Sequence, residues 1–326
     1  MAEKVAFIVV CWNNKTLLKE CFEAIDAQTY AQKVTYVIDN NSADGSADYI
    51  AKEFPKVKLL RSDKNNGFAR GNNLLIKEAL KDPEVGYIAL VNTDAMLDPQ
   101  WAEKIVAVAK QHPRAGGLQG VTIDYFNHSL IDSHHIKVSG NLQSIQSGYQ
   151  ESVSEKSYFT QTVMGVNAAA AVYTRSFVEG QPFEDFLDEK FFMYLEDVDI
   201  SLRALVTGWE NYFVAGAKAY HMGSVSAKKR SSDFSLCMTV RNQAALLYKN
   251  IPFAVFRRCF MKFIKFEIHF MLHIRRQYGN KTLLKLLKAR LEGILRLPLY
   301  IADHREIKRR RTISNEYLLQ LMMSSK

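Results

Sequence analysis

Three groups of carboxylates lie where they could bind a ligand or accept a proton. Asp39 follows the apolar segment YVI, Asp94 follows YIALVNT, and Glu196, Asp197 and Asp199 belong to the acidic string LEDVD. Asp39 and Asp94 each lie where an apolar segment gives way to a polar loop, and in an open α/β sheet ligands bind outside the carboxyl ends of the strands. An enzyme that holds a nucleotide, a divalent metal ion and a base needs carboxylates at such an edge.

The elements that would position these residues follow from two periodicities. Short apolar runs predict buried parallel strands, and apolar residues spaced by three and four predict amphipathic helices. The predicted strands cover residues 5–10, 34–38, 57–60 and 87–91, and the predicted helices cover 16–27, 46–54, 68–80 and 99–110. This alternation predicts an α/β fold in which a parallel sheet has helices on both faces.

The next hundred residues are less regular. We predict a long loop or small hairpins over 122–160, strands over 163–173 and 212–215, and a helix over 196–207. The strand over 163–173 is rich in small residues, which suit either tight packing or close approach of a ligand. We assign Gly165 and Asn167 to a ligand pocket and residues 169–171 to packing.

Charge divides the chain into two regions. Residues 1–224 carry 21 Lys and Arg against 28 Asp and Glu, a net charge of −7, whereas residues 225–326 carry 22 against 6, a net charge of +16. We therefore predict a catalytic domain over 1–224 and a basic helical C-terminal region over 225–326 that binds an anionic surface.

The cysteines and the N-terminus indicate the compartment. No two cysteines have the spacing of a metal-binding pair, and we interpret all four as buried thiols in a reducing compartment. They are Cys11, Cys21, Cys237 and Cys259. A polar loop follows the apolar run 5–10 directly, so we expect no cleavable signal peptide.

The tail from residue 250 onward combines basic and apolar helix faces. The basic side chains recur every three or four residues, at Arg258, Lys262, Lys265, His269, His273 and Arg276, and Phe256, Phe260, Phe263, Phe270 and Ile274 fall on other faces. Charges interrupt these stretches too often for a membrane-spanning helix, which needs about 20 mostly apolar residues. The faces suit a helix that lies on an anionic membrane. They also suit packing on the rest of the chain or on a second subunit, and both can hold at once.

A series of motifs resembles those of an inverting family 2 glycosyltransferase. In chain order they are VVCWNN, VIDNNSADGS, NNGFARGNN, NTD, LEDVD and AYHMGS. The resemblance covers residues 4–224 and implies the GT-A fold, a Rossmann-like, mostly parallel sheet flanked by helices. The long basic tail is most similar to that of bacterial rhamnosyltransferases that assemble surface polysaccharides.

The resemblance implies a binding site for a nucleoside-diphosphate sugar. It assigns Asp39 to a hydrogen bond from the pyrimidine ring, which a carboxylate accepts well, and it places Asn13 in the same pocket. Trp12 could pack beside the base or fill the core. The residues after Asp39 could instead be plain turn formers.

The loop over residues 65–73 would face the same donor. By resemblance, Asn66, Arg70 and Asn72 lie toward the nucleotide-sugar. Gly67 allows a close backbone approach, and the start of the following helix offers free N–H groups to a phosphate or a sugar hydroxyl. The Asn-Gly sequence is also common in ordinary turns, and that alternative stays open.

The NTD motif resembles the DxD motif of the family, with Asn in the first position. By this resemblance Asn92 and Thr93 lie at the donor and Asp94 binds Mg²⁺ or Mn²⁺, which would neutralise charge on the leaving diphosphate. His221 lies where the family often has a second metal ligand, and an imidazole ligand would favour Mn²⁺. A lone His is more often structural.

Glu196 and Asp197 are the candidates for the proton transfer. In an inverting reaction the acceptor hydroxyl loses its proton as it attacks, so a carboxylate must lie within hydrogen-bond reach. The resemblance assigns this role to Asp197, while Glu196 would hold the acceptor or raise the pKa of its neighbour. Both would also be favourable in the first turn of a helix. The basic run 228–230 could clamp a diphosphate or be a solvated charge run.

These features predict an inverting, metal-dependent glycosyltransferase. It would move a hexose or rhamnose from a UDP- or dTDP-linked donor to a hydroxyl of a glycan or a polyprenyl-diphosphate-linked acceptor. We expect it at the inner face of a bacterial cytoplasmic membrane, without a nucleic-acid partner, and the tail could form a homodimer. Two alternatives are a non-catalytic scaffold on the membrane surface and a sugar nucleotidyltransferase, although VVCWNNKT lacks the Gly-rich loop of the latter.

Overall fold

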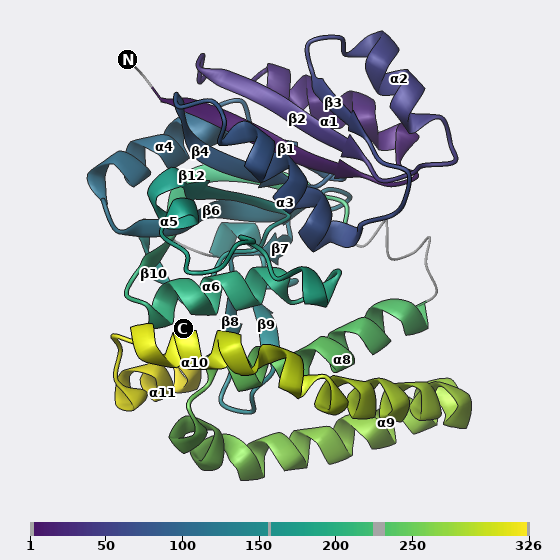
Figure 1. Ribbon diagram of the computed structural model, residues 1–326, viewed down its shortest axis with the longest axis vertical. Coiled ribbons are helices and arrows are strands. Elements are labelled where there is room, and N and C mark those ends of the chain that lie inside the picture. The colour runs from purple at the N-terminus through teal and green to yellow at the C-terminus, as the bar shows by residue number, and fades with distance from the viewer. Residues whose placement is uncertain (1–2, 156–157, 224–231, 325–326) are drawn as a thin grey trace.

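A mixed β-sheet forms the centre of the molecule (Figure 1). The computed structural model describes residues 3–155, 158–223 and 232–324. The order in the sheet is β10-β12-β6-β11-β4-β1-β2-β3, with β5 paired to β12 and β7 paired to β6, and β8 and β9 form a separate hairpin. The strands are β1 (Lys4–Cys11), β2 (Lys33–Asp39), β3 (Lys58–Arg61), β4 (Val85–Val91), β5 (Ala95–Leu97), β6 (Ala115–Asp124), β7 (Ile131–Ser133), β8 (His135–Val138), β9 (Ser144–Ser147), β10 (Gln161–Val163), β11 (Ala170–Thr174) and β12 (Glu210–His221).

The N-terminal half of the sheet has the predicted parallel arrangement. Strands β1, β2, β3 and β4 pair in parallel, and all seven residues of β4 are buried. Cys11 at the end of β1 lies opposite Asp39 at the end of β2. The loops that follow these strands therefore begin at the same edge of the sheet.

Helices cover both faces of the sheet, as predicted. One face packs against α1 (Lys15–Asp26), α2 (Ser46–Glu53) and α4 (Trp101–Gln111), and the other packs against α3 (Gly67–Ala79), α5 (Arg175–Glu179) and α6 (Glu196–Val206). Phe22 and Trp101 are buried on the first face, and Phe177 and Ile200 on the second. The GT-A architecture expected from the sequence is confirmed.

The predicted strand over 163–173 is wrong in its central part. It is two strands, β10 and β11, joined by a segment that leaves the sheet. The side chain of Asn167 explains this, because its Oδ1 accepts a hydrogen bond from the N–H of Ala169 at 2.9 Å and so replaces a partner from a neighbouring strand. The strand predicted over 212–215 is longer than expected and runs through β12 to His221.

The cysteines are free thiols. Cys11, Cys21 and Cys259 are buried, as predicted, and Cys237 is half-buried. Burial raises the pKa of Cys11 to about 11, so this thiol stays protonated at neutral pH.

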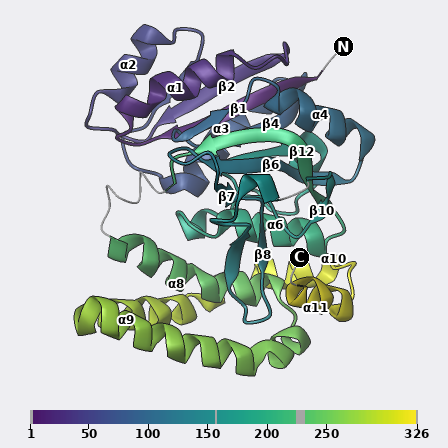
Figure 2. The same cartoon turned by 180° about the vertical axis from the view of Figure 1, so that it is seen from behind.

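The C-terminal region forms a helical layer that packs on the rest of the chain. Figures 1 and 2 show this layer beyond α6, on the side of α6 that faces away from the sheet. Val198 and Leu202 of α6 share one hydrophobic cluster with Leu246, Val255 and further residues of the layer, so the packing alternative is confirmed. The helices of the layer are α8 (Ser232–Asn250), α9 (Phe253–Leu295), α10 (Ile301–Arg310) and α11 (Asn315–Met323).

Helix α9 consists of two arms. Gly279 has a φ of 80° and a ψ of 177°, which breaks the helix into arms over 253–278 and 280–295. An ion pair of 2.5 Å between Glu267 and Arg290 joins the arms, so the chain folds back on itself at the glycine. Among the described helices none is long and apolar enough to cross a membrane.

Candidate active site

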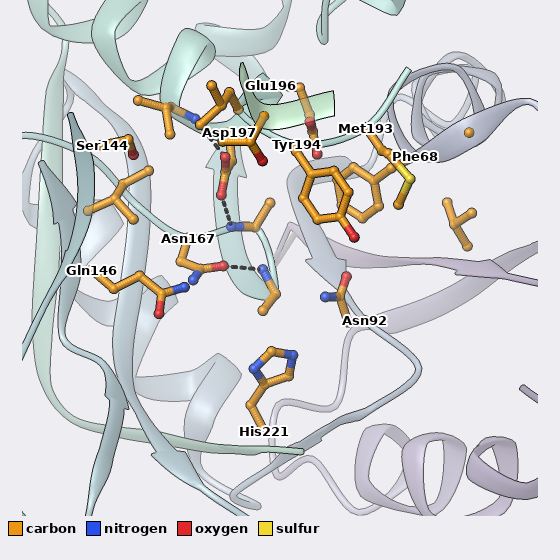
Figure 3. Close-up of a pocket in the computed structure, with 18 of the residues that line it drawn as sticks. Phe68, Asn92, Ser144, Gln146, Asn167, Met193, Tyr194, Glu196, Asp197 and His221 are labelled. Carbon is orange, nitrogen blue, oxygen red and sulfur yellow. Dashed lines mark hydrogen bonds between the residues drawn. The ribbon is translucent and has the colours of Figure 1, made fainter. Parts of the chain in front are cut away.

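A cavity of about 710 Å³ lies at the carboxyl ends of β1, β2 and β4 (Figure 3). The loops that follow these strands form one wall, as expected for an open α/β sheet. The hairpin of β8 and β9, the first turn of α6 and one face of α8 form the others. Its lining includes Trp12, Asn92, Thr93, Asp94, Asn167, Glu196, Asp197, His221, Thr239 and Gln243.

The acidic pair Glu196 and Asp197 begins α6 and lines the cavity. Asp197 accepts hydrogen bonds from the N–H groups of Val198 at 2.8 Å and Ala168 at 3.4 Å. Glu196 is buried, and its Oε2 has no hydrogen-bond partner among the described residues. Burial raises the pKa of Asp197, although the two N–H groups oppose this, and burial together with the charge of Asp197 raises the pKa of Glu196 well above its usual range. A carboxylate with a raised pKa suits a general base.

The turn that precedes this pair is strained and is held by α8. Three residues within 192–195 have a positive φ of 66° to 69°, which is costly for side chains other than glycine. Nδ2 of Asn242 lies 3.0, 2.9 and 2.9 Å from the carbonyl oxygens of Phe191, Met193 and Tyr194 and donates to them. The C-terminal region therefore fixes the backbone that leads into Glu196.

A buried charge network also joins α8 to α6. Nζ of Lys249 lies 2.7 Å from Oδ2 of Asp188 and 2.8 Å from Oδ2 of Asp199. Arg203 and Asn250 donate to the same Asp199 at 3.0 and 2.8 Å. Burial alone would raise the pKa of Asp188, but Lys249 outweighs it and the pKa is lowered. Asp199 thus belongs to a structural ion-pair network and not to the cavity.

Asp94 and His221 meet at the end of the cavity opposite the acidic pair. Nε2 of His221 lies 3.3 Å from Oδ1 of Asp94, and its Nδ1 lies 2.9 Å from Oδ2 of Asp132. Burial lowers the pKa of His221, but the hydrogen bonds to Asp132 and Asp94 outweigh it and raise the pKa to about 10. Within the described residues, no three His, Cys, Asp or Glu side chains converge as a complete metal site. Asp94 and His221 could supply two ligands to a cation whose other ligands come from a substrate and water.

Residues 6–179 match the family model described as "Glycosyl transferase family 2". The chain belongs to this family. The match covers the first strands, the NTD motif and β11, and it ends before α6. The acidic pair therefore lies outside the matched part of this glycosyltransferase.

Known proteins similar to this glycosyltransferase include bacterial enzymes. An "N-acetylglucosaminyl-diphospho-decaprenol L-rhamnosyltransferase" of Mycobacterium tuberculosis is 22% identical over 240 residues, which are 68% of this chain and 76% of the relative. Staphylococcus aureus TarS 1–349 matches in structure with a TM-score of 0.57 and 11% identity, over 98% of this chain and 90% of that chain. GalNAc-T7, solved with UDP, GalNAc and Mn²⁺, has a TM-score of 0.58 and 13% identity over 76% of this chain, which spans only 48% of that protein.

The residues predicted to bind the donor in this glycosyltransferase divide into those that line the cavity, those whose side chains are engaged within the protein, and Asp39. Asn92, Thr93 and Gly67 line the cavity, together with Trp12. Gly67 has a φ of 74°, and a Cβ there would lie 2.5 Å from the backbone oxygen of Phe192, so the close approach is to the protein's own turn.

Four other predicted donor residues do not line the cavity and use their side chains within the protein. Asn13 accepts from the N–H of Ala43 at 2.7 Å, Asn66 donates to Ser62 at 2.7 Å, Arg70 pairs with Glu189 at 3.4 Å, and Asn72 donates to the carbonyl of Phe68 at 2.9 Å. These contacts stabilise the loops around the cavity. The N–H groups expected to be free at the start of α3 are also engaged, because Phe68 and Ala69 donate to the carbonyl of Phe192 at 2.8 and 3.1 Å.

Asp39 is buried at the end of β2, next to the cavity and not in its lining. One carboxylate oxygen accepts from the N–H of Ser42 at 3.0 Å. The other, Oδ1, is buried and has no hydrogen-bond partner within the part of the chain that the structure describes. A buried carboxylate oxygen without a donor is costly, and a ligand N–H would satisfy it.

Several residues at or directly behind the cavity wall of this glycosyltransferase had no signal in the sequence. Asp132 orients His221, and Gln143 and Gln146 come from the hairpin of β8 and β9. Thr239 and Gln243 come from α8, in the region predicted to lie outside the catalytic domain. Each is brought to the site by contacts between segments that are far apart in the chain.

The assignment of Gly165 and Ala169 is wrong in both cases. A Cβ on Gly165 would lie 2.6 Å from Cβ of Ser201, so this glycine packs against α6, whereas Ala169 lines the cavity. Asn167 does line the cavity, as predicted. The basic run 228–230 lies outside the described residues.

Proposed function

We propose that this glycosyltransferase moves one sugar, with inversion, from a nucleoside-diphosphate donor to an acceptor hydroxyl. The proposal rests on the two ends of the cavity. In Figure 3, Glu196 and Asp197 lie at one end and His221 at the other, with Asn167 between them. A base and a diphosphate-binding end on opposite sides of one cavity suit a single in-line displacement at the anomeric carbon.

Asp197 accepts the proton of the acceptor hydroxyl as its oxygen attacks. The N–H groups of Val198 and Ala168 hold the carboxylate in place and stabilise its charged form before the reaction. Asn167 and Glu196 lie beside it and offer an amide and a second carboxyl to the hydroxyls of the sugars. The raised pKa of Glu196 favours its protonated form, in which it can donate a hydrogen bond to a sugar hydroxyl.

Asp94 and His221 are our candidates for binding Mg²⁺ or Mn²⁺. The pair fits a cation, since an oxygen and a nitrogen ligand lie 3.3 Å apart at the cavity and Asp132 orients the imidazole from behind. The ion would supply charge stabilisation to the leaving diphosphate. Because His221 is held as a cation by two carboxylates, binding of the metal must displace its proton.

The donor would be a UDP- or dTDP-sugar. The partnerless Oδ1 of Asp39 can accept the ring N–H of a pyrimidine base, and Trp12 in the adjacent lining offers a ring for stacking. The name of the M. tuberculosis relative supports rhamnose as the sugar and a polyprenyl-diphosphate-linked glycan as the acceptor. We place the reaction in the assembly of bacterial polysaccharides, in the cytoplasm at the inner face of the membrane.

We retain a catalytic domain over 1–224 and a C-terminal region over 225–326 as a proposal, with one addition. The C-terminal region is part of the site, because Thr239 and Gln243 line the cavity and Asn242 holds the turn before Glu196.

Thermal stabilisation by nucleotides tests the proposal. A ligand at a hundred times its Kd stabilises the folded state by about 2.7 kcal/mol, which raises the melting temperature by several degrees. We expect UDP or dTDP to stabilise the full chain more than GDP or ADP, and more with Mn²⁺ or Mg²⁺ than with EDTA. A folded protein that responds to none of these nucleotides would contradict the proposed donor site.

A further inference from the structure

Helix α9 has two different apolar faces. One face packs inward, where Val255 and Cys259 join the cluster shared with α6, and Ile274, Leu286 and Ala289 pack against α8. Packing in the core of the protein explains why this inward face is apolar. The opposite face points away from every described element and is apolar as well.

The outward face of the first arm is a continuous apolar stripe. Met261, Ile268 and Leu272 are 74%, 55% and 46% exposed, and with the half-buried Ile264 they recur every three or four residues along one side of the helix. Phe253, which is 77% exposed, lies at the N-terminal end of the arm and is separated from the stripe by the exposed Arg257. Single exposed apolar residues are ordinary, but a row of them along one helix marks an interaction surface.

The second arm continues the same pattern. Leu284, Leu287, Leu291 and Leu295 are exposed, at spacings of three and four residues. Figures 1 and 2 both show the two arms side by side, on the outside of the helical layer. The stripes of the two arms define the outer α9 surface.

A basic row flanks the stripe of the first arm. Arg258, Lys262, Lys265, His269 and Arg276 lie exposed along one side of it. Glu267 is the one acidic residue in the sequence of this arm, and it is turned inward in its ion pair with Arg290. Arg258 lies 3.9 Å from Glu316 of α11 in an exposed ion pair. The outer α9 surface of this arm thus combines bulky apolar side chains with a basic row that no acidic residue on the outer face of the arm neutralises.

We propose that the outer α9 surface binds an anionic lipid bilayer. Apolar side chains would enter the boundary between headgroups and acyl chains, while the basic row contacts lipid phosphates. The arm over 253–278 would lie in the plane of the membrane, since at 1.5 Å per residue it is about 39 Å long and is held against α8 along its inner face.

A lipid surface fits these residues better than a second copy of the chain or a nucleic acid. In a symmetric dimer through this surface the basic rows would face each other without acidic partners, which is unfavourable. A nucleic acid would neutralise the basic row but would leave Met261, Ile268 and Leu272 in contact with phosphates and water.

The proposal also sets where the cavity lies relative to the membrane. Helix α8 lines the cavity with Thr239 and Gln243 and packs against α9 on its other side. Packed helices lie 8–10 Å apart, so the catalytic cavity would be held roughly 20 Å from the lipid headgroups. This consequence rests on the proposed function, whereas the binding of the bilayer does not.

Vesicle binding tests the proposal with the full chain. We expect co-sedimentation with vesicles that contain phosphatidylglycerol, little with phosphatidylcholine alone, and weaker binding at high salt. The variant Met261→Ser/Ile268→Ser/Leu272→Ser should lose most binding, and Phe126→Ser/Phe159→Ser, which removes two exposed aromatic rings of the body, is the matched control.

A second pair of variants tests the basic row. Each Lys or Arg near an anionic surface contributes about 1 kcal/mol, so Lys262→Gln/Lys265→Gln/Arg276→Gln should weaken binding on the order of a hundredfold at low salt. The control Lys19→Gln/Lys52→Gln/Lys56→Gln removes the same charge from α1, α2 and the segment after α2 and should bind as the parent does. Because all these side chains lie on the surface, the melting temperatures should be unchanged.

Three results would overturn the proposal. The first is a folded protein that does not bind phosphatidylglycerol vesicles at low salt, or whose α9 variants bind like the controls. The second is a dimer in solution that the serine substitutions dissociate, without vesicle binding, which would make the surface an interface between copies. The third is binding to an oligonucleotide that depends on the basic row alone, again without vesicle binding.

Discussion

Asp197 differs from the other acids of its helix in what surrounds it. Asp199, two positions later, is neutralised by Lys249 and Arg203, whereas Asp197 faces the cavity with two backbone N–H groups as its donors. Its charge can therefore respond to a substrate. The same local sequence, LEDVD, thus contains one proposed base and one structural anchor.

Replacement of the proposed base should remove transfer and leave donor binding. Asp197→Asn keeps the size of the side chain but cannot accept the proton, and general bases contribute about 10²–10⁴-fold to rates. We expect kcat to fall by that factor while the stabilisation by nucleotide and metal stays within the range of the parent protein. Full activity in the variant would remove Asp197 from the mechanism.

The pH dependence of transfer should reflect the burial of this carboxyl. Because its pKa is raised, Asp197 remains protonated, and inactive as a base, at pH values above the ordinary Asp pKa of about 3.9. Activity should therefore fall on acidification through a pKa above that value, as kcat/KM measured against pH would show. In Glu196→Gln the acidic limb should remain, since burial and not Glu196 is its main cause. An acidic limb whose pKa equals the ordinary Asp pKa would contradict this explanation.

The Asp94 and His221 pair should couple metal and nucleotide binding. Asp94→Asn and His221→Ala each remove one proposed ligand, so the additional stabilisation by Mn²⁺ in the presence of nucleotide should be lost. Binding of nucleotide in EDTA should persist. Asp63→Asn, which removes an exposed carboxylate away from the cavity, is the control. Retained Mn²⁺ dependence in both variants would place the metal elsewhere.

Among the elements, α8 is both a wall of the cavity and a support of α6. Its Asn242 holds a turn whose positive φ angles cost free energy, and this turn sets the direction in which α6 begins. The same turn receives the first N–H groups of α3 through the carbonyl of Phe192. The start of α3 and the start of α6 are thus connected through one strained turn.

Removal of the Asn242 amide should affect chemistry more than donor binding. Asn242→Ala removes a donor from the carbonyls of Met193 and Tyr194, which costs about 1–3 kcal/mol if they stay buried, whereas the carbonyl of Phe191 keeps Arg241 and the N–H of Met193 as donors. We expect a lower melting temperature and a lower kcat, with a smaller change in KM for the donor, because the turn positions Glu196 and Asp197. Asn242→Asp cannot donate and should show the same pattern, whereas Asn280→Ala, exposed at the start of the second arm of α9, should not. Equal loss in kcat and in nucleotide stabilisation would indicate general unfolding instead.

At the scale of the whole molecule, the acidic body and the basic helical layer are joined by a shared core. Lys249 contributes the charge that Asp188 and Asp199 require, and Tyr300 and Leu318 lie in the same hydrophobic cluster as Val198. Removal of the chain after residue 250 would expose that cluster. Surface variants of α9 are therefore better tests of membrane binding than truncation.

The substitution Lys249→Met should measure how strongly the two regions depend on each other. Breaking a buried ion pair by removing one partner costs about 3–5 kcal/mol when the remaining charge is uncompensated, and here Lys190 and Arg203 still neutralise part of the charge on Asp188 and Asp199, so the cost should lie at or below the lower end. We expect the midpoint of urea unfolding to fall accordingly, with α6 and α8 lost in one transition. Lys288→Met, on the surface of α9, is the control. An unchanged midpoint would show that the network contributes no stability.

The sequence by itself determined the features that depend on local pattern. Apolar runs and helical spacings placed the strands and helices of the first 120 residues to within a few positions, because each element buries a face that its own residues define. The position of Asp94 after a buried strand indicated a ligand site. The resemblance to family 2 glycosyltransferases added Asn92 and Thr93 and assigned the acidic pair in LEDVD to proton transfer, while the local pattern also fitted a charged first turn of a helix.

Only the tertiary structure decided which side chains meet. His221 contacts Asp132 at a separation of 89 positions, Phe191 contacts Asn242 at 51, and Asp199 contacts Lys249 at 50. No local periodicity in the sequence indicates such contacts. The fold likewise turned Asn66 and Asn72 into supports of their own loops and made α8 a wall of the cavity. Long-range contacts of this kind depend on how whole layers pack. For the same reason the sequence could show that α9 has basic and apolar faces, but only the packing revealed which apolar face remains for a membrane.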